Sequence, residues 1–184
     1  EKATVTYPVC FYGHVDHGVW KPSLSIIAHA NDFLIPGFAT DNTIGLRLWS
    51  SKPTSELDEE KFRGGDYFEA LKQKQRCENL TSVLYPNDST WEGKEMRLMQ
   101  EFFMSSATLQ DILHRLKTQQ MAEPKDLPNF AAIQLNDTHP AIMVAELMRL
   151  LMDEEGLIYD EAIEICRAVF SYTCHTLLPE ALEK

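Results

Sequence analysis

Polar side chains that could bind a hydroxylated ligand follow a short apolar run in the last third of the chain. Asn136, Asp137 and His139 come after residues 130–135, a nearly continuous apolar run typical of a buried parallel strand. In open α/β sheets, ligands bind beyond the carboxyl ends of strands. A carboxylate accepts hydrogen bonds and an imidazole donates or accepts them, so this set suits polar recognition. The alternative is that Asp137 and Thr138 only cap a helix beginning at Pro140.

A second imidazole is expected at the same edge of the predicted sheet. His175, in the segment 174–176, follows the second of two helices predicted after that strand. A lone histidine is often a structural residue, but adjacent strand ends favour a binding role. A third polar turn, residues 85–90, contains Asp88 and Ser89. Its favoured interpretation is an ordinary turn followed by a helix cap.

Other candidate sites have weaker patterns. Residues 14–17 include two histidines and one aspartate, but no further clustered ligand accompanies them, so no metal site is predicted. A metal-assisted hydrolase built on Asp137 and His139 lacks ligands in the same way. Arg47 and Arg115 could bind a small anion, and a solvated surface is the alternative for each.

Hydrophobic periodicity predicts the elements that would position these residues. Residues 1–50 alternate in polarity and are broken by turn residues, which indicates a β-rich antiparallel meander. A helix over 66–83 has apolar residues at both ends and a polar middle, so it could be anchored at both ends and stand clear of its own core. Residues 94–117 repeat apolar side chains at helical spacing, which predicts a long amphipathic helix.

The last third, residues 130–184, has the order strand, polar turn, helix, helix and apolar run. This order is half of a doubly wound α/β sheet. The first helix, over 141–154, is apolar nearly all round, so we expect it to be buried. Asp160 can cap the second helix. The apolar stripe of that helix comprises Ala162, Ile165, Cys166, Val169 and Phe170.

Composition limits the class of protein. The chain has 184 residues and a net charge of −11, which argues against a nucleic-acid partner. No apolar stretch approaches the roughly 20 residues that span a bilayer, so no membrane segment is expected. The four cysteines lack paired spacing, which favours reduced thiols and a cytoplasmic location. The chain starts at Glu1 rather than Met, so we expect a piece of a longer protein.

Several long, colinear motifs resemble the α-glucan (glycogen/starch) phosphorylase family. The most extensive is Ala132-Ile-Gln-Leu-Asn-Asp-Thr-His-Pro140, with Glu-Leu-Met-Arg at 146–149. The other matching blocks are residues 11–13, 46–50, 84–88 with 93–95, 107–112 and 172–183. The resemblance covers essentially the whole chain, which is a minority of a family member. It implies part of the N-terminal Rossmann-like domain of a two-domain glycosyltransferase-B-type α/β fold, with a β-rich N-terminal portion.

The resemblance also implies an activity for the parent enzyme. Family members use pyridoxal phosphate and inorganic phosphate to release glucose 1-phosphate from α-1,4-glucan ends, in a cleft between two domains. The cofactor lysine belongs to the second domain and is absent from this chain, so the fragment would supply one wall of the site and be inactive alone. The segment 66–84 resembles the protruding helix of the homodimer, and 85–93 the loop that gates the cleft.

Individual site residues follow by motif. His175 resembles the residue that hydrogen-bonds the 6-hydroxyl of the glucosyl unit, and Asp137 its polar support. The implied substrate-binding residues are His175, Asp137, Asp88, Ser89, His139, Thr176 and Glu183. Arg115 and Arg47 fall at the implied effector phosphate site of these allosteric enzymes.

Three departures from the family pattern alter these expectations. His114 stands where animal members have the first of two arginines, so we do not expect activation by AMP. Ser89 replaces a common Asn in the gate loop, and Cys174 replaces the usual Asn beside the cleft histidine. The competing hypothesis is a noncatalytic carbohydrate- or partner-binding module derived from the same fold.

Overall fold

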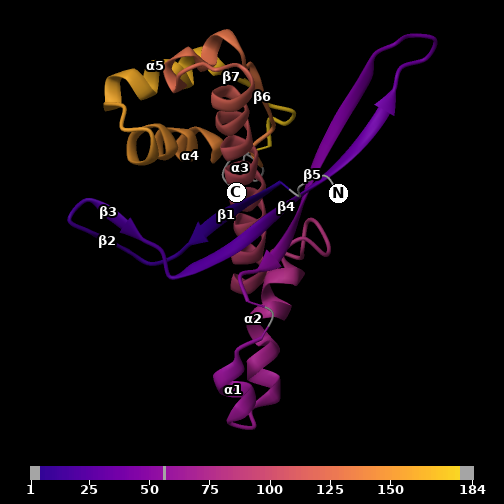
Figure 1. Cartoon of the computed structure of the whole chain (residues 1–184), viewed down its shortest axis with the longest axis vertical. Coiled ribbons are helices and arrows are strands. Elements are labelled where there is room, and N and C mark those ends of the chain that lie inside the picture. The colour runs from indigo at the N-terminus through magenta and orange to yellow at the C-terminus, as the bar shows by residue number, and fades with distance from the viewer. Residues whose placement is uncertain (1–4, 56, 179–184) are drawn as a thin grey trace. The chain divides into compact units, whose positions relative to one another are not determined.

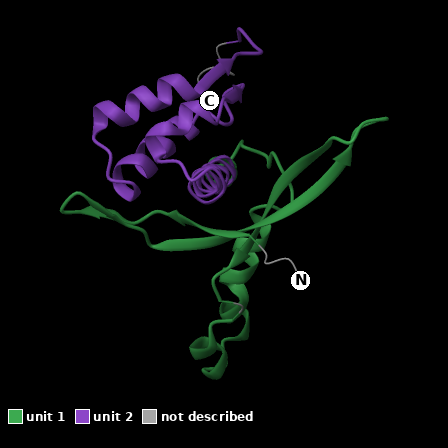
Figure 2. Ribbon diagram, turned by 45° about the horizontal axis from the view of Figure 1, so that its top comes forward, with its two compact units in different colours: residues 1–100 green, residues 101–184 purple. Residues whose placement is uncertain are grey.

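The computed structural model describes residues 5–55 and 57–178. The chain divides into two compact units, residues 1–100 and residues 101–184, coloured separately in Figure 2. Each unit combines helices with a small sheet, so the chain is a mixed α/β protein.

The first unit contains a three-stranded antiparallel sheet in the order β1-β4-β5 (Figure 1). Its strands are β1 (Thr6–Phe11), β4 (Leu24–Pro36) and β5 (Thr43–Pro53). A separate hairpin consists of β2 (His14–Asp16) and β3 (Val19–Lys21). Val9, Ile26 and Ala28 are buried. The predicted antiparallel meander is therefore confirmed.

Near the turn of the β4–β5 hairpin, apolar side chains pair across one face; we call these pairs the hairpin ladder. Phe33 pairs with Leu46 and Ile35 pairs with Ile44. All four side chains are at least 45% exposed in this chain. Cross-strand apolar pairs on one face stabilise a hairpin, so the hairpin ladder helps to hold β4 and β5 together. Among the described residues, no other layer covers it.

Three helices complete the first unit or begin in it: α1 (Glu59–Arg63), α2 (Tyr67–Asn79) and α3 (Trp91–Gln119). Asp66 caps α2, because its carboxylate accepts the Glu69 N–H at 3.3 Å. The helix ends at Asn79, four residues before the predicted end at Val83.

The prediction that α2 is anchored at both ends holds at only one of them. At its C-terminal end Cys77 and the adjacent Leu80 are buried, and the Ser51 hydroxyl donates to the Cys77 carbonyl at 2.6 Å. At its N-terminal end Tyr67 and Phe68 are 57% and 92% exposed. Tyr67 lies edge-on to the Phe62 ring of α1 with centroids 4.9 Å apart, and Ala70 is buried, so this end is only partly packed among the described residues.

The second unit contains the two parallel strands β6 (Ile133–Asn136) and β7 (Phe170–Thr173). Between them lie α4 (Met143–Arg149), the π-helical turn η2 (Leu150–Glu154) and α5 (Tyr159–Val169). The 3₁₀ turn η1 (Pro124–Asn129) precedes β6. The predicted order of strand, helix and helix is confirmed, and the apolar run predicted after them over 171–178 is a strand only as far as Thr173. The long helix predicted over 94–117 corresponds to α3.

The core of the second unit is formed by apolar faces of α3, α4 and α5. Leu109, Leu113, Leu147, Leu151 and Val169 are among its buried members. The apolar stripe predicted for α5 is confirmed for Ala162, Ile165, Cys166 and Val169, which are all buried. Its fifth predicted member, Phe170, is half-buried and is the first residue of β7 instead of part of the helix. The predicted burial of 141–154 is confirmed on one face only, since Ala145 and Asp153 are exposed.

Two predicted details are wrong. The N-cap of α5 is Ile158, and its N–H donates to the Glu161 carboxylate at 3.3 Å, so Asp160 lies within the first turn rather than at the cap. The strand β6 begins at Ile133 instead of Phe130, because the Phe130 N–H bonds back to the Leu127 carbonyl and extends the η1 turn.

A buried carboxylate joins α3 to α4. The Glu146 side chain is 1% exposed, and its oxygens accept the Ser106 hydroxyl at 2.6 Å and two Arg149 nitrogens at 2.8 and 3.0 Å. Arg149 also donates to Glu154 at 3.1 Å. Burial lowers the pKa of Arg149, but its bonds to Glu146 and Glu154 outweigh burial, so the pKa is raised.

Candidate functional site

The carboxyl ends of β6 and β7 form the candidate site. The strands are parallel and in register, with Asn136 opposite Thr173. The Asp137 N–H continues the ladder by donating to the Thr173 carbonyl at 2.8 Å. Residues that follow the two strands therefore emerge at one edge of the sheet, as expected from the sequence.

Two side-chain hydrogen bonds cross this strand pair along the same diagonal. Gln134 donates to the Thr173 hydroxyl at 2.5 Å, and Asn136 Oδ1 lies 2.5 Å from His175 Nε2. In each pair the partners are 39 residues apart in sequence. His175 is thus held at the strand end by Asn136.

The Asp137 side chain forms a hydrogen bond within its own turn. Its carboxylate accepts the Thr138 N–H at 2.9 Å, and its backbone has a positive φ of 70°. Such a φ is uncommon outside glycine and is tolerated best by Asn and Asp. Neither Asp137 nor Thr138 caps α4, whose N-cap is Ile142. Asp137 shapes the turn that follows β6.

The other predicted site residues of the second unit have local partners. His139 Nδ1 lies 3.5 Å from a Glu101 carboxylate oxygen. The Thr176 hydroxyl accepts the Leu178 N–H at 3.1 Å, and its carbonyl accepts the Cys174 thiol at 2.8 Å, so a tight turn follows His175. Glu183 lies outside the described residues.

In the first unit, Asp88 is fixed to the start of α3. Its carboxylate accepts a hydrogen bond from Arg97 at 3.2 Å, and the Arg97 guanidinium lies 5.4 Å from the centroid of the Tyr85 ring. Both the ion pair and the cation–π contact join the loop to the second turn of the helix. Sequence reasoning missed Arg97. The signal that could have revealed it is its place two helical turns after Thr90, the residue that precedes α3.

Residues 87–90 of the same loop pack against the first turn of α3. Asn87 Oδ1 accepts the Ser89 N–H at 2.8 Å, and the Thr90 hydroxyl accepts the Gly93 N–H at 3.2 Å. A Cβ atom on Gly93 would lie 1.8 Å from the Asn87 carbonyl oxygen, so the loop backbone lies directly against the first turn of α3. The predicted turn and helix cap are confirmed.

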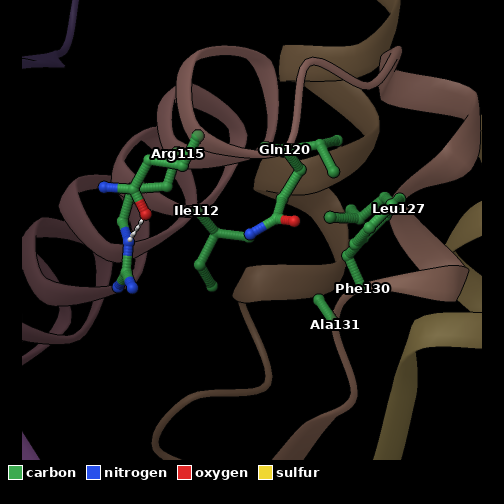
Figure 3. A pocket seen from close by; sticks show the side chains of 8 residues that line it. Ile112, Arg115, Gln120, Leu127, Phe130 and Ala131 are labelled. Carbon is green, nitrogen blue, oxygen red and sulfur yellow. Dashed lines mark hydrogen bonds between the residues drawn. The ribbon is translucent and has the colours of Figure 1, made fainter.

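The two candidate anion-binding arginines have different surroundings. Arg47 donates two hydrogen bonds of 2.7 Å to Asp32, directly across β4 and β5, so its charge is compensated. Arg115 lies 3.9 Å from Asp111 and donates to Gln119 at 3.4 Å. Arg115, Gln120 and Phe130 line an open pocket of about 250 Å³ (Figure 3).

Over residues 5–55 and 57–178, no group of three or more His, Cys, Asp or Glu side chains is arranged to hold a metal ion. Within the same residues, no helix has the length and apolar character needed to span a bilayer.

The chain belongs to the carbohydrate phosphorylase family, whose sequence pattern matches residues 1–184. The family resemblance found in the sequence is therefore confirmed.

Individual relatives align over the whole chain. It is 48% identical to glycogen phosphorylase 2 of Dictyostelium discoideum, 45% to glycogen phosphorylase of Saccharomyces cerevisiae and 44% to the brain form of human glycogen phosphorylase. The alignments cover 100% of this chain but only 19%, 21% and 23% of those proteins. The chain thus spans about a fifth of the length of these curated relatives.

Proposed function

We propose that this chain is part of an enzyme that phosphorolyses α-1,4-glucan ends to glucose 1-phosphate, and that it forms one wall of the sugar site. Family membership and the names of the relatives support this activity. The observation that carries the siting is the pair Asn136 and His175, at the carboxyl ends of two parallel strands. A noncatalytic module is not favoured, because the relatives are named as phosphorylases.

In this proposal the residues of the chain recognise and orient the sugar. His175 hydrogen-bonds the 6-hydroxyl of the glucosyl unit, and the turn after it presents Thr176 to the same side. Asp137, His139 and Glu183 complete the polar wall. Asp88 and Ser89 belong to the loop that gates access, and the contacts of Arg97 set the resting position of this loop.

Pyridoxal phosphate, the proposed cofactor of the whole enzyme, supplies phosphate-based acid and base chemistry when bound. The residues present here do not fit it. Of the described lysines, Lys74 is half-buried and all others are exposed, and no lysine lines the pocket beside Arg115. A covalently held cofactor needs a lysine in an enclosed site, so its lysine must belong to the rest of the enzyme.

Two further roles follow from surfaces of the chain. We propose that α2 contributes to a homodimer, because Tyr67, Phe68 and Leu71 are exposed at its N-terminal end.

Arg115 is the better candidate for an effector phosphate, since Arg47 already forms a bidentate pair with Asp32. A cytoplasmic enzyme is consistent with the four free thiols.

The proposed sugar contact is tested by His175→Ala in the full-length enzyme. The substitution leaves a sugar hydroxyl unpaired, so kcat/KM should fall by an amount equivalent to about 1–3 kcal/mol. A 6-deoxy glucosyl substrate removes the other half of the same contact and should largely erase the difference between variant and parent. If the penalty persists undiminished with the 6-deoxy substrate, His175 has another role.

A further inference from the structure

We propose that Asn136 is a positioning residue that fixes the tautomer of His175, so that its ring accepts rather than donates the hydrogen bond from the sugar 6-hydroxyl. This inference rests on the proposed function for the identity of the ligand. The tautomer itself is a property of the free protein.

The geometry that carries the inference is the diagonal contact across β6 and β7. Asn136 Oδ1 lies 2.5 Å from His175 Nε2. The preceding diagonal pair, Gln134 and Thr173, has the same separation of 39 residues and also spans 2.5 Å. Asn136 is the last residue of β6 and His175 lies two residues beyond β7, so the Asn136 contact continues the diagonal that Gln134 and Thr173 form within the strand pair.

The chemistry follows from the atoms that meet. An amide oxygen only accepts hydrogen bonds, so the ring nitrogen facing it must carry the proton. In a neutral imidazole, the second nitrogen then has a lone pair and no proton. His175 Nδ1 is thus left as an acceptor, and a ligand must donate to it. A hydroxyl group can do so by turning its proton towards the ring.

An uncharged partner suits this task. A carboxylate facing Nε2 would also select the tautomer, but its charge would favour the doubly protonated ring, which has no acceptor. The nearest carboxylate along the chain, Asp137, is instead directed to the Thr138 N–H. Asn136 consequently defines the direction of the hydrogen bond without adding charge.

The first test compares glucose 1-phosphate carrying hydroxyl, fluorine or hydrogen at C6 in the synthetic direction of the full-length enzyme. Fluorine cannot donate, so the fluoro and deoxy compounds should both show kcat/KM about tenfold or more below the hydroxyl compound. Asn136→Ala should reduce this hydroxyl preference several-fold, because both tautomers become accessible. Asn136→Asp should also reduce the preference, because a carboxylate at Nε2 favours the doubly protonated ring, which has no acceptor.

The matched control is Gln134→Ala, which removes the equivalent diagonal bond of the same strand pair without touching His175. This variant should keep the full hydroxyl preference. A purely structural role for Asn136 would lower kcat/KM for all three compounds by the same factor. That result, or a fluoro compound clearly better than the deoxy compound in the unmodified enzyme, would overturn the proposal.

A second test needs no substrate. Selective ¹⁵N labelling of histidine in the full-length enzyme, with the His175 signals assigned by their loss in His175→Ala, should show a protonated Nε2 and an unprotonated Nδ1. Asn136→Ala should shift the signals towards a tautomer mixture. A proton on Nδ1 of the neutral ring in the unmodified enzyme would refute the role of Asn136. Absence of phosphorolysis would refute only the proposed function, since the spectrum still reports the tautomer.

Discussion

The Glu146 side chain is buried in the core among three hydrogen-bond donors. Ser106 and Arg149 satisfy both of its oxygens, and Arg149 continues to Glu154. Burying a carboxylate without partners is very costly, so the stability of α3 against α4 depends on this set. The raised pKa of Arg149 keeps the guanidinium charged throughout the accessible pH range.

Arg149→Leu should therefore destabilise the protein by about 3 kcal/mol, because it leaves the buried Glu146 carboxylate without its charged partner. Urea denaturation of the full-length enzyme, followed by a probe in this domain, measures the change. The double variant Glu146→Leu/Arg149→Leu should cost clearly less than the single one, since no buried charge remains. A double variant less stable than Arg149→Leu would contradict this explanation.

At the residue scale, the sequence indicated which polar side chains gather at the strand ends but not which of them touch. His175 and Asn136 could both be placed beyond or at a strand end from the apolar runs before them. In the strand register Asn136 lies opposite Thr173, and His175 is two residues further along the chain. The contact therefore depends on how β6 and β7 align, which is a property of the tertiary structure. The resemblance implies that Asp137 is the polar support of His175, and in the structure its carboxylate accepts the Thr138 N–H.

At the scale of the elements, the position of the loop over 85–93 depends on Gly93, which has no Cβ atom. Gly93→Ala should displace the loop from α3, because the added Cβ would meet the Asn87 carbonyl oxygen at 1.8 Å. We expect a loss of about 1–3 kcal/mol in stability and faster hydrogen exchange at 85–90. Gly45→Ala is the matched control, since nothing lies within 4 Å of its Cβ position. Unchanged exchange in Gly93→Ala would show that the close approach is absent in solution.

The helix α2 provides the test of the proposed homodimer. Gln73 is exposed in its middle, and proline there removes a backbone donor and clashes with the preceding turn, at a cost of about 3 kcal/mol or more. Gln73→Pro should shift the full-length enzyme towards monomer in sedimentation, and Gln73→Ala should not. A dimer that persists with α2 demonstrably broken would exclude this helix from the interface.

Sequence periodicity predicted the type of most elements, and it failed where an element departs from regular geometry. The 29 residues of α3 repeat apolar side chains at helical spacing, so the helix could be found directly. The π-helical turn over Leu150–Glu154 could not, because its buried Leu150 and Leu151 fit an α-helical stripe equally well. The ends of α2 and β6 were set by local backbone hydrogen bonds that no composition rule describes.

For the whole molecule, we expect the chain alone to lack covalently bound pyridoxal phosphate. Every described lysine is at least partly exposed, and several pair with carboxylates, as Lys72 does with Glu69 and Lys117 with Glu155. The purified chain, mixed with the cofactor, should show no stable aldimine absorbance band. A band that borohydride abolishes, with label on one specific lysine, would contradict this expectation.

The long separation between Asn136 and His175 links the site to the local stability of the second unit. The two residues are neighbours only while the crossover through α4 and α5 keeps β6 beside β7. Closing such a segment costs entropy that the packed helices must offset, whereas the six-residue connection between β4 and β5 closes locally. Transient opening of α5 would therefore release the imidazole from its amide partner although neither residue lies in that helix. Local unfolding of α5 would then make both neutral tautomers of the ring accessible.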